Sequence, residues 1–119
     1  MDKPDGLAVF ATFYHIEQGD SDVWSDFTSK LQQIQEPGES LNNFSGLTLA
    51  SFMPPETEKF YRYQGSLTTP DCFESVTWTV FYQFLSISED QMSSFRALNN
   101  GEGQPIVNNF RPLQPLHGR

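Results

Sequence analysis

The sequence predicts an α+β domain that consists mainly of β-structure. Four segments have the alternating or continuous apolar pattern of β-strands, whereas two have the spacing of amphipathic helices. Aromatic residues make up 14% of the 119 residues, and 11 of them are phenylalanine, so large apolar groups are available for a core. A charged fraction of 18% is too low for a disordered tail. We therefore expect one folded domain over residues 1–119.

The first element is predicted from Leu7 to Ile16, after a turn signal at Pro4-Asp5-Gly6. In an extended chain, both faces of this segment carry apolar side chains. A strand that is buried on both faces has this continuous pattern, so we expect it in the interior of a sheet.

The second element is an amphipathic helix that begins at Asp22 and lies on the sheet. Asp20, Ser21 or Asp22 can serve as its N-cap, and Pro37-Gly38 ends the pattern. Apolar residues recur at helical spacing at Val23, Trp24, Phe27, Leu31 and Ile34.

Three candidate strands and one extended loop follow this helix. Leu47 to Leu49 is a short candidate strand, and Phe60 to Tyr63 is a short aromatic strand. Gly65 to Cys72 is predicted to be an extended loop that Pro70 constrains. From Val76 to Phe84, apolar and polar residues alternate, which predicts a strand with its large apolar groups on one face.

A capping box of Ser88 and Gln91 predicts the start of a second helix. Met92, Phe95 and Leu98 form its buried side, and residues 99–101 (Asn-Asn-Gly) end it. The tail contains Pro105, Pro112 and Pro115 and is predicted to be irregular.

The net charge of −8 argues against nucleic acid and against an anionic membrane surface as partners, because both attract Lys and Arg. The sequence contains no cluster of basic residues. It also lacks a run of eighteen apolar residues, and residues 1–5 have neither the basic flank nor the apolar stretch of a signal peptide. We expect no targeting signal within this sequence.

Residue chemistry alone identifies no catalytic group and no metal site. Zinc needs three or four ligands, and the two histidines, His15 and His117, are far apart in sequence. A serine nucleophile is not expected, because no Gly-x-Ser-x-Gly motif is present. Cys72, the single cysteine, cannot form an internal disulfide and is expected to be a half-buried free thiol.

The tract from Gly65 to Pro70, followed by Cys72, Glu74, Val76 and Trp78, resembles the active-site wall of the α-class carbonic anhydrases. Blocks at 3–9, 61–81, 87–98 and 109–116 resemble that family in the same order. The resemblance covers almost the whole chain and corresponds to the C-terminal half of the family's catalytic domain. It implies part of a twisted, mostly antiparallel sheet with flanking helices.

In the complete family domain, three histidines hold a zinc ion that lowers the pKa of its bound water, and the resulting hydroxide converts CO2 to bicarbonate. The resemblance implies that Thr68 accepts a hydrogen bond from this hydroxide and orients it. Thr69 lines the polar side of the site. The positions that hold CO2 on the apolar side are Val9, Leu67, Val76 and Trp78.

In the family, the three histidine ligands, the glutamate that receives the threonine proton and the usual histidine proton shuttle precede the matched half. We therefore expect this chain alone to bind no zinc and to be inactive. As partner we expect the missing N-terminal half, or a second copy through an exposed sheet around Val9, Val76 and Trp78. The competing interpretation is an acatalytic carbonic-anhydrase-related protein that serves as a binding module.

Two features favour a secreted or cell-surface parent protein. Extracellular members of the family carry a cysteine just after the Thr-Thr-Pro segment and pair it with one near their N-terminus, which implies the same pairing for Cys72. Asn43-Phe44-Ser45 is also a glycosylation sequon.

Overall fold

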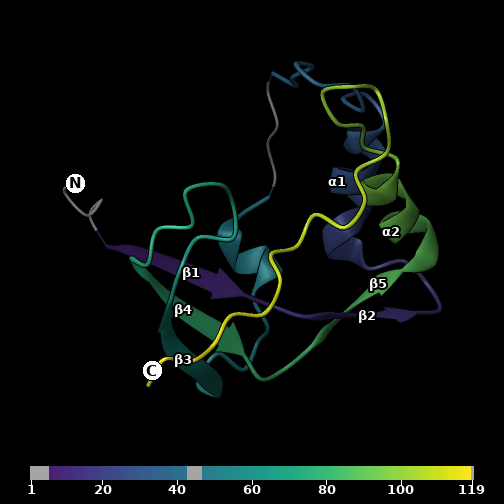
Figure 1. The fold of residues 1–119 in the computed structure, drawn as a ribbon. Helices are drawn as coiled ribbons and strands as arrows, with labels where there is room; N and C mark the ends of the chain where they lie inside the picture. Colours follow the sequence, from purple (N-terminus) through teal and green to yellow (C-terminus); the bar gives the residue numbers. More distant parts are fainter. Residues whose placement is uncertain (1–5, 43–46, 119) are drawn as a thin grey trace. The chain divides into compact units, whose positions relative to one another are not determined.

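A computed structural model describes residues 6–42 and 47–118 of the chain (Figure 1). It contains five strands, two α-helices and one 3-10 helix, which confirms the predicted α+β class. In chain order these are β1 (Leu7–Ala11), β2 (Tyr14–Glu17), α1 (Asp22–Leu31), η1 (Leu49–Phe52), β3 (Phe60–Gly65), β4 (Val76–Phe81), β5 (Leu85–Ser88) and α2 (Glu89–Arg96).

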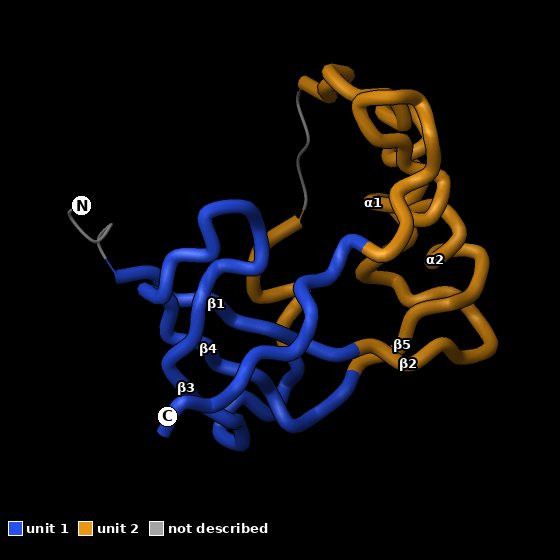
Figure 2. The backbone as a smooth tube through the Cα atoms, in the orientation of Figure 1, with its two compact units in different colours: residues 1–13, 54–84, 109–119 blue, residues 14–53, 85–108 orange. Residues whose placement is uncertain are grey.

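The chain forms two compact units (Figure 2). Unit 1 comprises residues 1–13, 54–84 and 109–119, and unit 2 comprises residues 14–53 and 85–108. The single domain over residues 1–119 stays a prediction. Neither described helix is long and apolar enough to cross a membrane.

Unit 1 is built on a three-stranded sheet in the order β1-β4-β3. β1 runs parallel to β4 with Val9 opposite Trp78, and β3 runs antiparallel to β4 with Tyr63 opposite Trp78. Because side chains alternate along a strand, Val9, Tyr63 and Trp78 share one face of the sheet, which we call the tryptophan face. Phe10 and Phe81 share the opposite face, where their rings stack at 6.1 Å.

Unit 2 combines the two-stranded parallel sheet β2-β5 with the helices α1 and α2, which pack against each other. Leu31 and Ile87 are buried in it. Its interior is a cluster of aromatic rings whose centroids lie about 5 to 6 Å apart. The cluster consists of Tyr14, Trp24, Phe27, Phe52 and Phe95.

The predicted capping box at the start of α2 is confirmed. The Ser88 hydroxyl accepts a hydrogen bond from the Gln91 N–H at 3.1 Å, and the Gln91 amide oxygen accepts one from the Ser88 N–H at 3.3 Å. Gln91 also accepts from the N–H of Ser21 and donates to its carbonyl oxygen, at 3.0 and 2.8 Å. Ser21, the N-cap of α1, makes no capping bond with its own side chain, so Gln91 organises the start of both helices.

The continuous strand predicted from Leu7 to Ile16 is wrong, because two strands separated by Thr12 and Phe13 occupy this segment. Two residues separate Ala11 from Tyr14, whereas four separate their partners Val80 and Leu85. This shift in register breaks the ladder. The predicted interior position is also wrong, since among the described residues β1 pairs with β4 alone and lies at a sheet edge.

The strand predicted from Leu47 to Leu49 is wrong as well. Residues 49–52 form the 3-10 helix η1, in which Ser51 N–H donates to Thr48 O and Met53 N–H donates to Ala50 O. Three residues of alternating polarity cannot distinguish a strand from a helical turn, and Pro54 limits the segment immediately afterwards.

The sense of strand pairing differs from the mostly antiparallel expectation. Two of the three described strand pairings are parallel, and β3-β4 is antiparallel. The strand predicted from Val76 to Phe84 ends at Phe81, and its apolar residues do not all point to one face: Phe81 and Thr79 are buried opposite Trp78. Tyr82 and Phe84 lie beyond the strand and are exposed.

Candidate functional site

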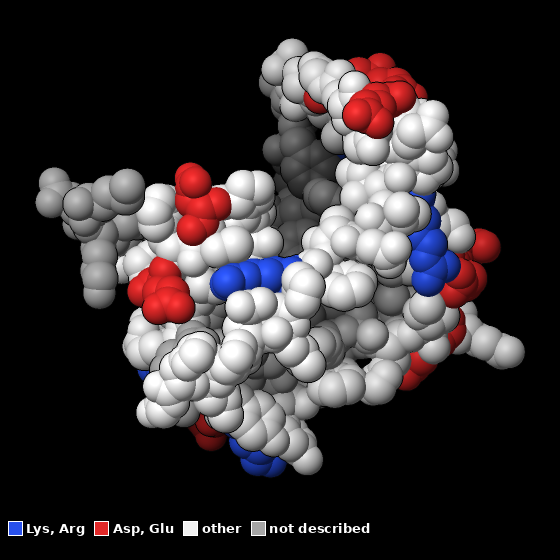
Figure 3. Space-filling view, viewed as in Figure 1, with Lys and Arg blue, Asp and Glu red and all other residues white. Residues whose placement is uncertain are grey.

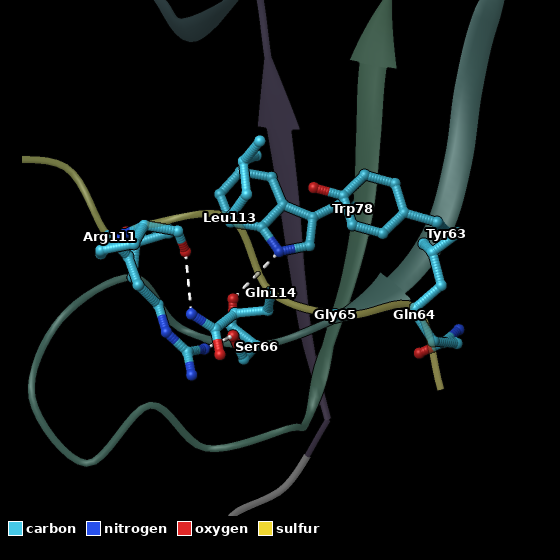
Figure 4. Close-up of a pocket in the computed structure, with 11 residues that line it drawn as sticks. Tyr63, Gln64, Gly65, Ser66, Trp78, Arg111, Leu113 and Gln114 are labelled. Carbon is cyan, nitrogen blue, oxygen red and sulfur yellow. Dashed lines mark hydrogen bonds between the residues drawn. The ribbon is translucent and has the colours of Figure 1, made fainter. Parts of the chain in front are cut away.

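The candidate site lies on the tryptophan face of unit 1, at the end of β3 and the loop that follows it. The indole of Trp78 stacks on the ring of Tyr63, with centroids 6.3 Å apart and planes 7° from parallel. The indole N–H donates a hydrogen bond to the carbonyl oxygen of Ser66 at 3.1 Å (Figure 4). The direction of the indole is therefore fixed from two sides.

Gly65 allows this arrangement because it has no side chain. A Cβ atom at this position would lie 2.8 Å from Cδ1 of Trp78 and 3.0 Å from Cε2 of Tyr63. Both distances are at or below the closest approach of carbon atoms in proteins. The glycine thus leaves the space into which the two rings fit.

A cavity of about 320 Å³ opens beside these rings. Its lining comes from the end of β3, from Thr68 and Trp78, and from the C-terminal tail, where Arg111 lies. The Arg111 guanidinium donates a hydrogen bond to the hydroxyl of Ser66 (Figure 4). The cavity therefore combines two aromatic rings with a hydroxyl group and a cation.

The loop from Ser66 to Phe73 is folded back on itself and is not extended as predicted. The N–H of Leu67 donates to the carbonyl oxygen of Phe73, and the N–H of Cys72 donates to that of Thr69, both at 3.0 Å. Asp71 and Cys72 have positive φ angles of 77° and 44°, which turn the chain. This turn brings the two arms of the loop together, and Ser66 and Thr68 of its first arm line the cavity.

Two of the predicted site residues, Thr68 and Trp78, line the same cavity. Val9 lies beside Trp78 across the β1-β4 ladder and is half-buried, whereas Leu67 and Thr69 belong to the loop and do not line the cavity. Val76 is fully buried, with 0% exposure, so its predicted place in an exposed apolar surface is wrong. Val76 lies in the middle strand of the sheet, opposite Leu7 of β1 and Gly65 of β3.

Other apolar groups are exposed instead. The described residues of unit 1 with large exposed apolar side chains include Leu7, Phe10, Phe13, Phe60, Tyr61, Tyr63, Tyr82 and Phe84. Phe13 and Phe84 contact each other at 5.4 Å, and Tyr61 and Tyr82 at 6.2 Å. On the face shown in Figure 3, Lys and Arg side chains lie apart and form no continuous basic patch.

Zinc does not fit the residues that the structure describes. Within residues 6–42 and 47–118, no three His, Cys, Asp or Glu side chains come close enough to hold a metal ion. His15 lies in β2 of unit 2, and His117 lies in the tail of unit 1. The thiol of Cys72 is free and half-buried, and it donates to the carbonyl oxygen of Thr69 at 3.2 Å.

Several cavity residues were not predicted from the sequence as site residues. Tyr63 lines the cavity beside Trp78, and Arg111 reaches it from the tail. Gly65 and Ser66 also line it; they belong to the tract that resembles the active-site wall, but no role of their own was predicted for them. The sequence feature that could have pointed to Arg111 is its position before Pro112, as the one charged residue between Asn109 and Gln114. The sequon at Asn43 lies outside the described residues.

Comparison with known proteins gives a consistent result. The sequence profile described as "Eukaryotic-type carbonic anhydrase" matches residues 1–119. "Putative carbonic anhydrase 5" of Caenorhabditis elegans is 40% identical over 122 residues, which cover 100% of this chain and 38% of the relative. "Carbonic anhydrase 15" of Mus musculus is 40% identical over 124 residues, which cover 98% of this chain and 38% of the relative. "Carbonic anhydrase 6" of Homo sapiens is 36% identical over 121 residues, covering 100% and 39%. The chain spans about two fifths of the length of these relatives.

Proposed function

The chain belongs to the eukaryotic-type carbonic anhydrase family, and from this premise we propose that it forms the C-terminal portion of a domain that hydrates CO2 to bicarbonate. The observation that carries the proposal is the family match over residues 1–119, together with the cavity that Thr68 and Trp78 share. The chain spans about two fifths of its relatives, so the activity belongs to the complete domain in this proposal.

In the proposed complete domain, this chain supplies the surface against which CO2 lies. CO2 has no net dipole, so apolar side chains hold it through dispersion and dehydration. Trp78 is suited to this role because Tyr63 and Ser66 fix its indole. Val9 is its neighbour in the sheet, Leu67 follows in the loop, and Val76 supports the strand from a buried position.

The proposed role of Thr68 is to orient the attacking oxygen. Its hydroxyl can donate one hydrogen bond and accept others, and the residue is exposed at the edge of the cavity. Thr69 adds a second exposed hydroxyl in the same loop. The metal chemistry is assigned to the part of the relatives' length that this chain does not span, because the described residues hold no metal-binding group.

The proposal predicts an effect of Thr68→Ala on CO2 hydration by the longest protein that contains this chain. We expect the rate in a stopped-flow assay to fall about 10- to 100-fold, because residues that orient reacting groups commonly have effects of this size. Thr48→Ala is the matched control, since Thr48 is exposed, belongs to unit 2 and does not line the cavity. Equal rates for the two variants would contradict the role of Thr68.

The chain of 119 residues is assayed in parallel, with added zinc, alone and mixed with the remaining part of the domain. We expect hydration at the buffer rate from the chain alone and a higher rate from the mixture. If neither the mixture nor the longer protein is active, the acatalytic interaction protein becomes the better description.

We further propose a secreted or cell-surface location for the complete protein. Support comes from the sequon at Asn43 and from Cys72, whose thiol has no disulfide partner among the described residues. The proposed partner of Cys72 is a cysteine outside this chain.

A further inference from the structure

Arg111 is a half-buried cation that lines the cavity and has no carboxylate partner among the described residues. The ion pairs of the described residues are Lys30–Asp26, Lys59–Glu56 and Arg96–Glu89, and Arg111 belongs to none of them. Its one described hydrogen bond goes from Nη1 to the hydroxyl of Ser66. A guanidinium has five N–H donors, so most of its capacity is available to a ligand.

The rest of the cavity is mainly apolar. Tyr63 and Trp78 present stacked rings, and Leu113 and Leu116 contribute aliphatic groups from the tail. The amide of Gln114 donates to the carbonyl oxygen of Pro112 at 2.9 Å, which holds the tail in a turn beside Arg111 (Figure 4). One cation at the edge of an aromatic surface is a pattern that recognises an anion with an apolar body.

We propose that this cavity binds a small organic carboxylate. The carboxylate accepts two parallel hydrogen bonds from the guanidinium of Arg111, and an aromatic or branched aliphatic body lies against Trp78 and Tyr63. A volume of about 320 Å³ lies at the small end of the range for ligand cavities, which suits a molecule of the size of benzoate. All lining residues belong to unit 1.

Charge explains why we choose an anion that also has an apolar body. The net charge of −8 repels simple anions at long range, so the cation of Arg111 alone gives little affinity. Burial of apolar surface must supply the remaining free energy of binding. A cationic ligand is disfavoured, because Arg111 would repel it from the same rings. The proposed carboxylate site shares Trp78 with the proposed CO2 surface, and its binding test does not depend on CO2 hydration.

The test is a titration of the isotope-labelled chain with sodium benzoate, followed by NMR at the indole N–H groups of Trp78 and Trp24. We expect the Trp78 signal to shift with a dissociation constant on the order of a millimolar, and the Trp24 signal to stay in place. Arg111→Gln should weaken binding at least about 10-fold, since a charge-assisted pair is lost. Arg96→Gln, which removes an exposed arginine of α2, should change the dissociation constant for benzoate less than about twofold.

Ligand variants keep the test decisive if Arg111→Gln fails to fold. Benzamide has the same ring without the charge, and acetate has the charge without the ring, so both should bind the unaltered chain at least about 10-fold more weakly than benzoate. Benzamide binding as well as benzoate would overturn the proposal. The proposal would also be overturned if benzoate shifted the Trp78 signal of Arg111→Gln as it shifts that of the unaltered chain. The same holds if the Trp78 signal of the unaltered chain did not shift up to about 50 mM benzoate.

Discussion

Replacing Gly65 by alanine tests whether the indole of Trp78 lies against the end of β3. The added Cβ would lie 2.8 Å from Cδ1 and 3.1 Å from Nε1 of Trp78, and 3.0 Å from Cε2 of Tyr63. The chain cannot yield easily at this point, because Gly65 is buried and paired with Val76 in the ladder. The rings must therefore move, and the hydrogen bond from Trp78 to Ser66 is lengthened or lost.

The expected cost follows from three contributions. Overpacking costs about 1 to 3 kcal/mol, and loss of a hydrogen bond costs about 0.5 to 1.5 kcal/mol. Alanine gains about 0.5 to 1 kcal/mol over glycine in a strand, because glycine loses more conformational freedom on folding. We expect the free energy of unfolding to fall by about 0.5 to 4 kcal/mol, which corresponds to a melting temperature lower by about 2 to 16 °C.

The assay is urea unfolding of the chain, combined with the NMR position of the Trp78 indole N–H. Gly101→Ala is the control, because a Cβ at Gly101 meets no atom within 4 Å. We expect that variant to be unchanged or more stable by up to about 1 kcal/mol. If Gly65→Ala is as stable as Gly101→Ala and the Trp78 signal does not move, the described stacking is refuted.

Two further predictions concern unit 2. Gln91→Ala removes the buried amide that hydrogen-bonds with Ser21 and Ser88, so the free energy of unfolding in urea should fall by about 2 to 4 kcal/mol. In the control Ser93→Ala, which changes an exposed residue, it should fall by less than about 0.5 kcal/mol. Similar losses for both variants would contradict the bridging role of Gln91. Burial raises the pKa of Tyr14 above its usual value of 10.0, so the folded chain keeps the phenolic proton after the unfolded chain has released it. This contribution to stability is complete below about pH 10 and is lost as the pH rises through the folded-state pKa. As the pH rises from about 9.5 to 11, the free energy of unfolding should therefore fall less for Tyr14→Phe than for the unaltered chain. An equal or larger fall for Tyr14→Phe would count against the effect.

Features that depend on neighbouring residues were predictable from the sequence, and features that depend on distant partners were not. The capping box of Ser88 and Gln91 is local, and its prediction is confirmed. Trp24, Phe27 and Leu31 marked α1 through their spacing, although the helix ends at Leu31, before Ile34. The break at Thr12 and Phe13 depends on a register with β4 and β5, which the pattern of residues 7–16 does not contain.

The candidate site shows the same division. Thr68 and Trp78 were singled out because their neighbours resemble a known family, and the structure places them in one cavity. Arg111 could not be assigned from the sequence, since it is 45 positions from Ser66, which it contacts. Val76, which is fully buried, likewise lies opposite Leu7 and Gly65, and the first of these partners is 69 positions away in sequence.

The two parallel ladders and the bridge between Ser21 and Gln91 join residues about 70 positions apart, which has a consequence for synthesis on the ribosome. Translation adds about 5 to 20 residues per second, so roughly 4 to 14 s pass between the synthesis of β1 and β2 and the synthesis of their partners β4 and β5. During that interval, Leu7, Phe10 and Ile16 lack the strands with which β1 and β2 pair in the structure, so chaperone dependence and misassembly are expected to be concentrated at residues 7–17.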